Sequence, residues 1–376
     1  MVGAAAVWPA FGKLFFQAYM EALLDWPYAI LVAALLMIHW KIYKEPVQAG
    51  LLSFFVLLLS LPAGLLGSLL LVLAGIRAEA LPAANMLVLT IVLGLVRPRF
   101  ICLAYSGSLL CFSSLLFGWP ALEVPQVMGL VAILHLVESA LVALSGSRGG
   151  RPVLTPGAAG AGAWRKHYDL FRLWPLPMVA ITAAFIPQGQ MPPGLTEMPD
   201  WWPLLDSGAK ALSLQAQAQG RSLIFALSPF VAMLGYSQRF TSERVYFGKG
   251  RRTQDKAKSS DKGACTPAAK GGIQAMARGT GRGTGKGAGK GSGRRAAAQS
   301  RAKREAGTEA AVNKGLRHSS FKLLAYSLIL FSFSWLAARQ PAAAPGQSLR
   351  YWLQYLPPLW GLLGHEWIAG SFGSKQ

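Results

Sequence analysis

The chain has 376 residues, of which 53% are hydrophobic and only 14% are charged, whereas a soluble domain is about one quarter charged. So few charged residues cannot cover a soluble core of this size, and the composition predicts a protein covered by lipid. The net charge of +21 does not indicate a folded nucleic-acid-binding domain, because 20 of the 37 Lys and Arg lie between residues 238 and 318.

The cysteines are too few and too scattered to organise a fold or a metal site. Cys102 and Cys111 lie in apolar runs, and Cys265 lies in a polar, glycine-rich stretch. An odd, dispersed set of cysteines predicts neither a disulfide framework nor a CxxC metal-binding motif. We therefore interpret Cys102 and Cys111 as small buried apolar residues, and we predict no metal and no cofactor.

Residues 1–26 form an N-terminal amphipathic segment. Within residues 8–25, apolar side chains recur at helical spacing with polar side chains between them, which predicts a helix lying in the membrane interface. No small-residue cleavage site follows the first apolar stretch, so we expect no cleaved signal peptide. The apolar positions are Phe11, Leu14, Phe15, Tyr19, Ala22 and Leu23.

Nine apolar segments in the rest of the chain are candidates for membrane-spanning helices. A span needs about 20 apolar residues, or fewer when flanking side chains reach the interface. The sequence therefore predicts an all-α, polytopic transmembrane helical bundle of about eight or nine spans. The segments are 27–43, 50–74, 83–97, 100–118, 126–146, 170–188, 222–238, 321–338 and 350–371.

These segments divide the chain into four parts. The N-terminal segment 1–26 precedes residues 27–238, which hold about seven spans. Residues 239–318 are predicted to form a long, disordered Gly/Lys/Arg-rich cytoplasmic loop. Residues 319–376 hold the last one or two spans and a short cytoplasmic C-terminus.

Prolines and glycines mark tight packing in two of the spans. In the second span, Pro62 predicts a kink, and Gly64 and Gly67 predict a close contact with a neighbour. At the head of the sixth span, Pro175 and Pro177 predict a fixed entry geometry and leave backbone groups that a neighbour must satisfy.

The distribution of basic residues between the loops predicts the orientation. Lys and Arg are concentrated after the first, third, fifth and seventh spans, whereas the other loops are poor in them or carry acids. Cytoplasmic loops carry the excess of Lys and Arg. We therefore expect a multi-pass protein of a bacterial plasma membrane, with its N-terminus outside and its C-terminus in the cytoplasm.

The basic loop is predicted to bind negatively charged surfaces. Glycine occupies every second position from 279 to 293, which leaves no apolar face to bury. Lys and Arg beside a cytoplasmic membrane face attract anionic lipid headgroups or an acidic partner, and the scarcity of aromatic residues disfavours nucleic acid. The candidate binding residues are Arg251, Arg252, Arg282, Lys286, Lys290, Arg294, Arg295, Arg301, Lys303 and Arg304.

Four ionisable residues within predicted spans are the candidates for chemistry. His135 and Glu138 stand three residues apart and so share one helix face, whereas His365 and Glu366 are adjacent and point in different directions. Such groups are costly in hydrocarbon and usually face a protein interior or a wet cavity.

Three interpretations of these residues are open. His365 and Glu366 begin an HExxH motif, but Ala369 stands where the second histidine of a zinc protease would be. A proton or ion relay through His135, Glu138 and Glu366 would indicate a transporter. Alternatively, the polar pairs hydrogen-bond between helices and stabilise their packing. No motif indicates an enzyme.

A series of short motifs resembles the membrane region of MinJ-type proteins, which are PDZ-containing topological factors of division-site selection in Gram-positive bacteria. The series is LHLVESALVALSG (134–146), FRLWPLPMVA (171–180), LSPFVAMLGYSQ (227–238) and LGHE (363–366). The resemblance implies a non-enzymatic scaffold that recruits division proteins of the DivIVA and MinD type at septa and poles, and it leaves self-association open.

Two differences from the MinJ-type family are expected. Ten residues follow the LGHE motif, so no PDZ domain is expected and no peptide-binding groove is carried over. The basic loop resembles an insertion into a shorter connection. We expect either a truncated or split product, or a basic loop that has taken over partner binding.

Overall fold

The structure is a computed structural model. It describes residues 3–43, 45–78, 81–97, 100–146, 148, 150–156, 163–183, 225–246, 290–339 and 349–373. The chain forms two compact units, which are described separately. The first comprises residues 1–149, 170–238 and 315–376, and the second comprises residues 150–169 and 239–314.

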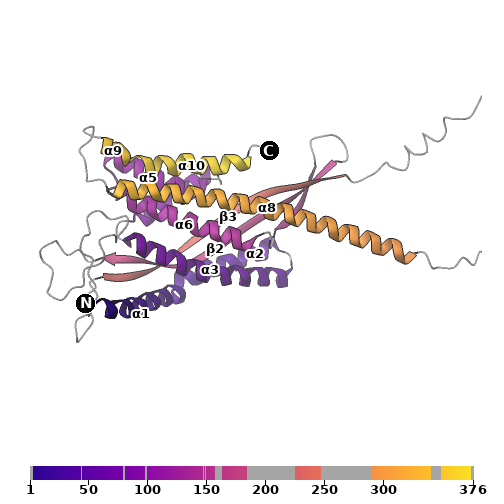
Figure 1. Cartoon of the computed structure of the whole chain (residues 1–376), viewed down its shortest axis with the longest axis horizontal. Helices are drawn as coiled ribbons and strands as arrows, with labels where there is room; N and C mark the ends of the chain where they lie inside the picture. Colours follow the sequence, from indigo (N-terminus) through magenta and orange to yellow (C-terminus); the bar gives the residue numbers. More distant parts are fainter. Residues whose placement is uncertain are drawn as a thin grey trace, which may run out of the picture. The chain divides into compact units, whose positions relative to one another are not determined.

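The first unit is a bundle of helices (Figure 1). Three of its helical segments are long and apolar enough to cross a membrane, Pro46–Ala74, Val124–Ser145 and Val312–Ala338. A fourth crossing is formed if Gly12–Leu24 and Trp26–Ile42, which meet at a bend of 51°, count as one broken span. The helices are α1 (Gly3–Leu24), α2 (Trp26–Ile42), α3 (Pro46–Ala74), α4 (Ala83–Val96), α5 (Leu103–Phe117), α6 (Val124–Ser145), α8 (Lys290–Ala338, which enters this unit at residue 315), α9 (Leu349–Leu353) and α10 (Leu356–Gly373).

The chain is therefore a mostly helical protein with several apolar helices that could span a membrane, but the count of eight or nine spans is not reproduced. Helices α4 and α5 have 14 and 15 residues. At 1.5 Å per residue each is about 21–23 Å long, which is shorter than the roughly 30 Å hydrocarbon core.

The sixth and seventh predicted spans are wrong as helices. Their residues form long strands, β2 (Ala163–Ala183) and β3 (Phe225–Tyr246), and β2 lies between β1 (Arg151–Pro156) and β3 in one sheet. A residue before proline is pushed toward extended backbone, and proline itself lacks the N–H that a helix interior needs. Pro175 and Pro177 therefore favour a strand over a helix at this point of β2.

Within the second unit, β1 and the start of β2 pair as antiparallel strands. The register joins Arg151 to Asp169 at one end and Pro156 to Trp164 at the other. This short ribbon lies in the segment that was predicted to be a basic cytoplasmic connection between two spans.

In the first unit, β2 is buried and packs against α3. Its buried residues include Trp174, Leu176 and Met178. Gly64 permits the contact, because an added Cβ would overlap the carbonyl oxygen of Pro177. At Gly67 an added Cβ would lie 2.6 Å from the terminal methyl of Met178. The close packing predicted for these two glycines is confirmed, and the partner is a strand.

The backbone of β2 also finds partners in α3 and the residues after it. The N–H of Val179 donates to Ser68 Oγ at 3.0 Å, and the N–H of Ile181 donates to the carbonyl of Ile76 at 3.3 Å. Buried backbone groups need such partners, since an unpaired one costs about 1–3 kcal/mol. The expectation that a neighbour satisfies the backbone after the two prolines is thus confirmed for these two groups.

The predicted N-terminal amphipathic helix is present as α1. Phe15, Tyr19 and Ala22, which lie on one face, are buried, whereas Lys13 and Glu21 are exposed. The buried face is directed at the protein, so at least part of the apolar stripe serves packing. Placement in a membrane interface stays a prediction.

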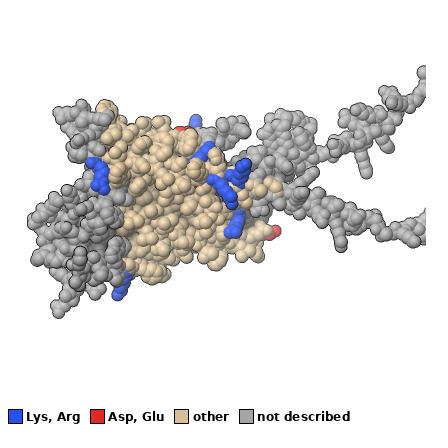
Figure 2. Space-filling model, viewed as in Figure 1, with Lys and Arg blue, Asp and Glu red and all other residues tan. Residues whose placement is uncertain are grey.

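The outer surface of the bundle is apolar over a broad band (Figure 2). On the face drawn there, Lys and Arg lie toward the two ends of a wide area without charge. Large apolar side chains are exposed along single helices, such as Leu51, Phe54 and Leu58 of α3. A continuous exposed apolar surface of this kind fits contact with lipid.

Two segments that were predicted to be loops on the same side of the membrane are joined directly. Arg77, which follows α3, forms an ion pair with Glu123, which precedes α6. Gln126 accepts from the N–H of Arg77 at 3.0 Å and donates to the carbonyl of Gly75 at 3.2 Å. The end of α3 and the start of α6 therefore lie at the same end of the bundle.

Part of the predicted disordered loop is helical. Residues 247–289, with Arg251, Arg252, Arg282 and Lys286, lie outside the described residues. From Lys290 the chain is helical, so disorder is the wrong prediction for residues 290–318. Ala, Arg, Lys and Glu dominate this stretch and are strong helix formers, and the apolar end of α8 supplies a helix to extend. The candidate residues on α8 are Lys290, Arg294, Arg295, Arg301, Lys303 and Arg304.

We predict that Gly64→Ala destabilises the bundle by about 1–3 kcal/mol, because the new methyl overlaps the backbone of β2. Gly50→Ala is the matched control in the same helix, since an added Cβ there meets nothing within 4 Å. This control should be neutral or slightly stabilising. Unfolding midpoints of the two purified variants in detergent test the contact. Equal midpoints would contradict the packing of α3 on β2.

Candidate functional site

The four predicted intramembrane residues lie on two helices. His135 and Glu138 of α6 are 4% and 9% exposed, so the face that carries them is directed into the bundle, as their spacing predicted. His365 and Glu366 lie on α10, and both are partly buried. Helix α10 packs against α5 and α6, which brings the two pairs into one region.

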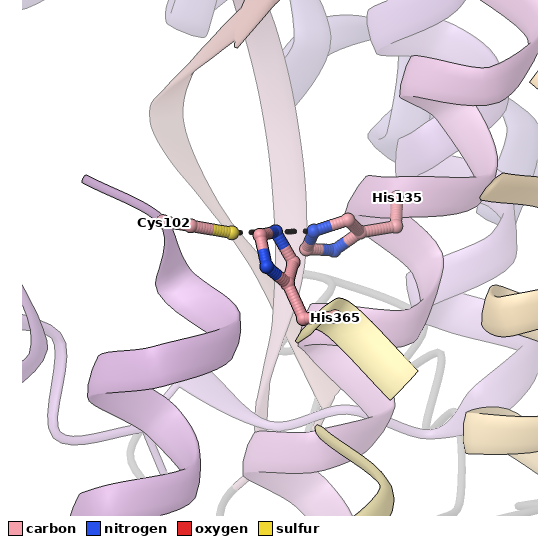
Figure 3. A group of neighbouring side chains, drawn as sticks. All are labelled: Cys102, His135 and His365. Atoms are coloured by element: carbon pink, nitrogen blue, oxygen red, sulfur yellow. Dashed lines mark hydrogen bonds between the residues drawn. The ribbon is translucent and has the colours of Figure 1, made fainter. Parts of the chain in front are cut away.

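The centre of this region is a cluster of three side chains from three helices. The ring centroids of His135 and His365 are 5.8 Å apart, and Cys102 Sγ lies 3.3 Å from His135 Nε2. The three side chains point toward one another (Figure 3). Their ligand atoms all lie within 4.8 Å of one another.

His135 is held in one orientation by the backbone of its own helix. Its Nδ1 lies 2.8 Å from the carbonyl oxygen of Val131. A carbonyl only accepts, so Nδ1 must carry the proton, and in the neutral ring Nε2 is then an acceptor. The thiol of Cys102 is the donor that faces it.

Cys102 was predicted to be a small apolar residue, but its sulfur makes polar contacts. It is the N-cap of α5, and its sulfur accepts the N–H of Ala104 at 3.4 Å. Cys111, two turns farther along α5, is fully buried and fits the original interpretation better.

Tyr105 separates the two adjacent residues of α10. Its ring lies against that of His365, with centroids 4.7 Å apart, and its hydroxyl donates to Glu366 Oε1 at 2.6 Å. The side chain of His365 therefore lies beside Cys102 and His135, whereas Glu366 accepts a hydrogen bond from Tyr105. The different directions predicted for this pair are consistent with this arrangement.

Helix α8 forms another wall of the site through Tyr326. Its ring centroid lies 5.3 Å from that of His135, and its hydroxyl donates to the carbonyl of Gly361 at 3.2 Å. Gly364 makes room for the same ring, because an added Cβ would lie 2.7 Å from a ring carbon of Tyr326. The site is thus enclosed by α5, α6, α8 and α10.

The polar face of α6 continues beyond His135. Ser139 and Ser320 of α8 exchange hydrogen bonds, each hydroxyl donating to the other residue's carbonyl at 2.8 Å. Glu138 is different, since it makes no hydrogen bond or ion pair with any residue that the structure describes. One buried carboxylate thus stands beside a cluster of paired polar groups.

Cys102, Tyr105 and Tyr326 are the members of the site that the sequence analysis missed. Cys102 is 33 residues from His135, and Tyr105 is 261 residues from Glu366, so no local spacing relates them. The sequence indicates these residues only indirectly, because a Tyr hydroxyl or a thiol within an apolar run needs a hydrogen-bond partner.

Comparisons of the chain with protein-family models, with curated proteins and with solved structures gave no match.

Proposed function

We propose that this chain is a multi-pass scaffold of the bacterial plasma membrane that recruits division-site selection proteins at septa and poles. The proposal rests on the resemblance to the membrane region of MinJ-type proteins. One structural observation carries it, namely that the four motif segments behind the resemblance contact one another inside the first unit.

The contacts run from segment to segment. Arg172 of β2 donates from Nη2 to the carbonyl of Gly146, at the end of α6, at 3.2 Å. An added Cβ at Gly235 of β3 would lie 3.0 Å from Leu173 of β2. The histidines of α6 and α10 meet at 5.8 Å. The four segments that resemble the MinJ-type family therefore contact one another in one core. This is expected if the family shares a bundle built from these segments.

The interior of this core favours a fixed framework. Ser139 pairs with Ser320, Tyr105 pairs with Glu366, and Tyr326 pairs with the backbone of α10. Hydrogen bonds between helices in an apolar setting are each worth about 0.6–2 kcal/mol and fix the packing. A rigid bundle is what a recruiting platform requires, because its partners must meet the same surface each time.

The proposed topology has the N-terminus outside and the C-terminus in the cytoplasm. It assigns Arg77 and Glu123 to the same side, and their ion pair agrees with that part of the assignment. Replacing two predicted spans by two strands leaves the parity of crossings unchanged, so the segments on either side of β2 and β3 keep the same assignment. The Lys and Arg from Arg251 to Arg304 then face anionic headgroups, at about 1 kcal/mol per residue near the surface.

A second candidate function is a small transporter, and Glu138 is the observation that favours it. A buried carboxylate without a hydrogen-bond or ion-pair partner among the described residues is the kind of group that binds and releases a proton or cation. His135 lies one turn away on the same face. A relay would use these two residues with Glu366.

We predict that a C-terminal fluorescent fusion of the full chain is enriched at septa and poles of dividing Gram-positive cells. Fluorescence itself requires the C-terminus to be cytoplasmic, so the same images test the topology. The control is a fusion to an unrelated membrane anchor at the same expression level. An even distribution around the membrane, equal to that of the control, would contradict the scaffold.

Glu138→Gln separates the two functions. A scaffold should localise unchanged and conduct no protons in reconstituted vesicles before or after the substitution. A transporter should conduct protons in the parent and lose at least about 90% of that flux in the variant, because the amide cannot take up a proton near neutral pH. A pH-sensitive dye inside the vesicles reports the flux, and Glu21→Gln on the exposed face of α1 is the matched control.

A further inference from the structure

We propose that Cys102, His135 and His365 form a binding site for a transition metal ion of the Zn²⁺ class. Cys102 is the N-cap of α5, His135 and His365 lie on α6 and α10, and the three side chains point toward a common centre (Figure 3). One thiolate and two imidazoles are a ligand set that Zn²⁺ commonly takes, with the fourth position left to water or another ligand. The site goes beyond the scaffold function and does not depend on it.

The spacing of the ligand atoms suits one ion. Bond lengths of about 2.3 Å to sulfur and 2.0–2.1 Å to nitrogen place the donors of a tetrahedral ion roughly 3.3–3.7 Å apart. Cys102 Sγ and His135 Nε2 are already 3.3 Å apart, and no pair among the three ligand atoms exceeds 4.8 Å. Metal binding therefore requires the most distant pair to close by up to roughly 1.5 Å.

His135 has the outer partner typical of a metal ligand. Ligating histidines usually donate their other ring N–H to a carbonyl or carboxylate, which fixes the tautomer and the ring orientation. Here Nδ1 donates to the carbonyl of Val131 at 2.8 Å, so the lone pair of Nε2 faces Cys102. The ring is prepared to bind an ion without any change in its own hydrogen bond.

Binding of a divalent ion changes the net charge of the site. Binding replaces the thiol proton of Cys102, which leaves to solvent, with a Zn–S bond, so a divalent ion and one thiolate leave a net charge of +1. A buried net charge is costly unless it is compensated. Glu138, one turn from His135 and without another hydrogen-bond or ion-pair partner among the described residues, supplies the compensating negative charge.

The aromatic surroundings restrict access to the site. Tyr105 and Tyr326 pack edge-on against His365 with centroids 4.7 and 6.3 Å away, and Tyr326 also packs against His135. His135 is buried and Cys102 and His365 are half-buried, and an apolar shell of this kind limits the access of solvent to a metal site. The bound ion would join α5, α6 and α10, which are far apart in the sequence.

The test is metal binding by the full chain in detergent, in a Cys265→Ser background that removes the thiol outside the described residues. The protein is stripped with a chelator and titrated with Zn²⁺, and with Co²⁺ as a spectroscopic probe. We expect one ion per chain and a Co²⁺–thiolate charge-transfer band in the near ultraviolet. Cys102→Ser should abolish the band, and His135→Gln and His365→Gln should weaken binding at least about 100-fold.

Two matched controls use the same residue types elsewhere in the bundle. Cys111→Ser removes a buried thiol from the same helix, and His39→Gln removes a buried histidine that lies 2.8 Å from Ser53. Both should bind one ion with the affinity of the parent. Failure of the parent to bind, or unchanged binding by Cys102→Ser, would overturn the proposal.

A second measurement needs no substitution at the site and so does not depend on the folding of variants. In the same background, Zn²⁺ should protect Cys102 from alkylation by a small thiol reagent, as counted by mass spectrometry, and should leave the rate at Cys111 unchanged. Equal alkylation rates at Cys102 with and without Zn²⁺ would contradict metal binding.

Discussion

The arrangement of the site depends on the close approach of α10 to α5 and α6 at Gly361. A Cβ at this position would overlap Ser108 Oγ and lie 2.7 Å from the terminal methyl of Met128, so a larger residue fits only if these side-chain ends are moved or replaced. His365 follows Gly361 by four residues and therefore lies on the same helix face. The contact that glycine permits is thus the contact that delivers His365 to Cys102 and His135.

A second constraint is that backbone groups inside an apolar bundle must be paired within the protein. Helices pair their backbone groups internally, but a strand such as β2, which Pro175 and Pro177 favour over a helix, needs partners outside itself. The strand is accommodated because Gly64 lets α3 approach it and because Ser68 accepts the N–H of Val179. The glycines of α3 and of α10 therefore have the same role in two different contacts.

Local patterns in the sequence predict those features whose causes are local. The apolar runs that became α3, α6 and the end of α8 were found because a long charge-free segment is a sufficient signal. Burial of His135 and Glu138 on one face followed from their spacing. The strands were missed because hydropathy alone does not separate a buried strand from a buried helix, and Pro175 and Pro177 were interpreted as marks of a span entrance.

The features that escaped prediction depend on tertiary contacts. Nothing in the sequence relates Cys102, the N-cap of α5, to His135 of α6 or to His365 of α10. The start of α8 was interpreted as disordered because the glycine-rich stretch before it dominated the composition, although Ala, Arg and Lys follow it. That stretch up to residue 289 lies outside the described residues, so its disorder stays a prediction.

The polar cluster connects the two proposals. As a set of hydrogen bonds and ring contacts, it stabilises the packing of α5, α6, α8 and α10, which is what a scaffold needs. As a ligand set, it would make that packing dependent on a metal ion, since an ion that binds only the folded chain stabilises it by mass action. The proposed metal site and the proposed rigid framework therefore share Cys102, His135 and His365.

The most direct test of this account is a disulfide between α5 and α10. An ideal Cβ at position 361 lies 3.5 Å from the Cβ of Ser108, within the roughly 3.5–4.5 Å that a disulfide requires. In a chain with Cys102, Cys111 and Cys265 replaced by Ser, the pair Ser108→Cys and Gly361→Cys should cross-link under mild oxidation. Mass spectrometry of the linked peptides detects it, and Gly50→Cys with Gly361→Cys is the control pair. Absence of the 108–361 link, or equal linking in the control, would contradict the packing from which the site is built.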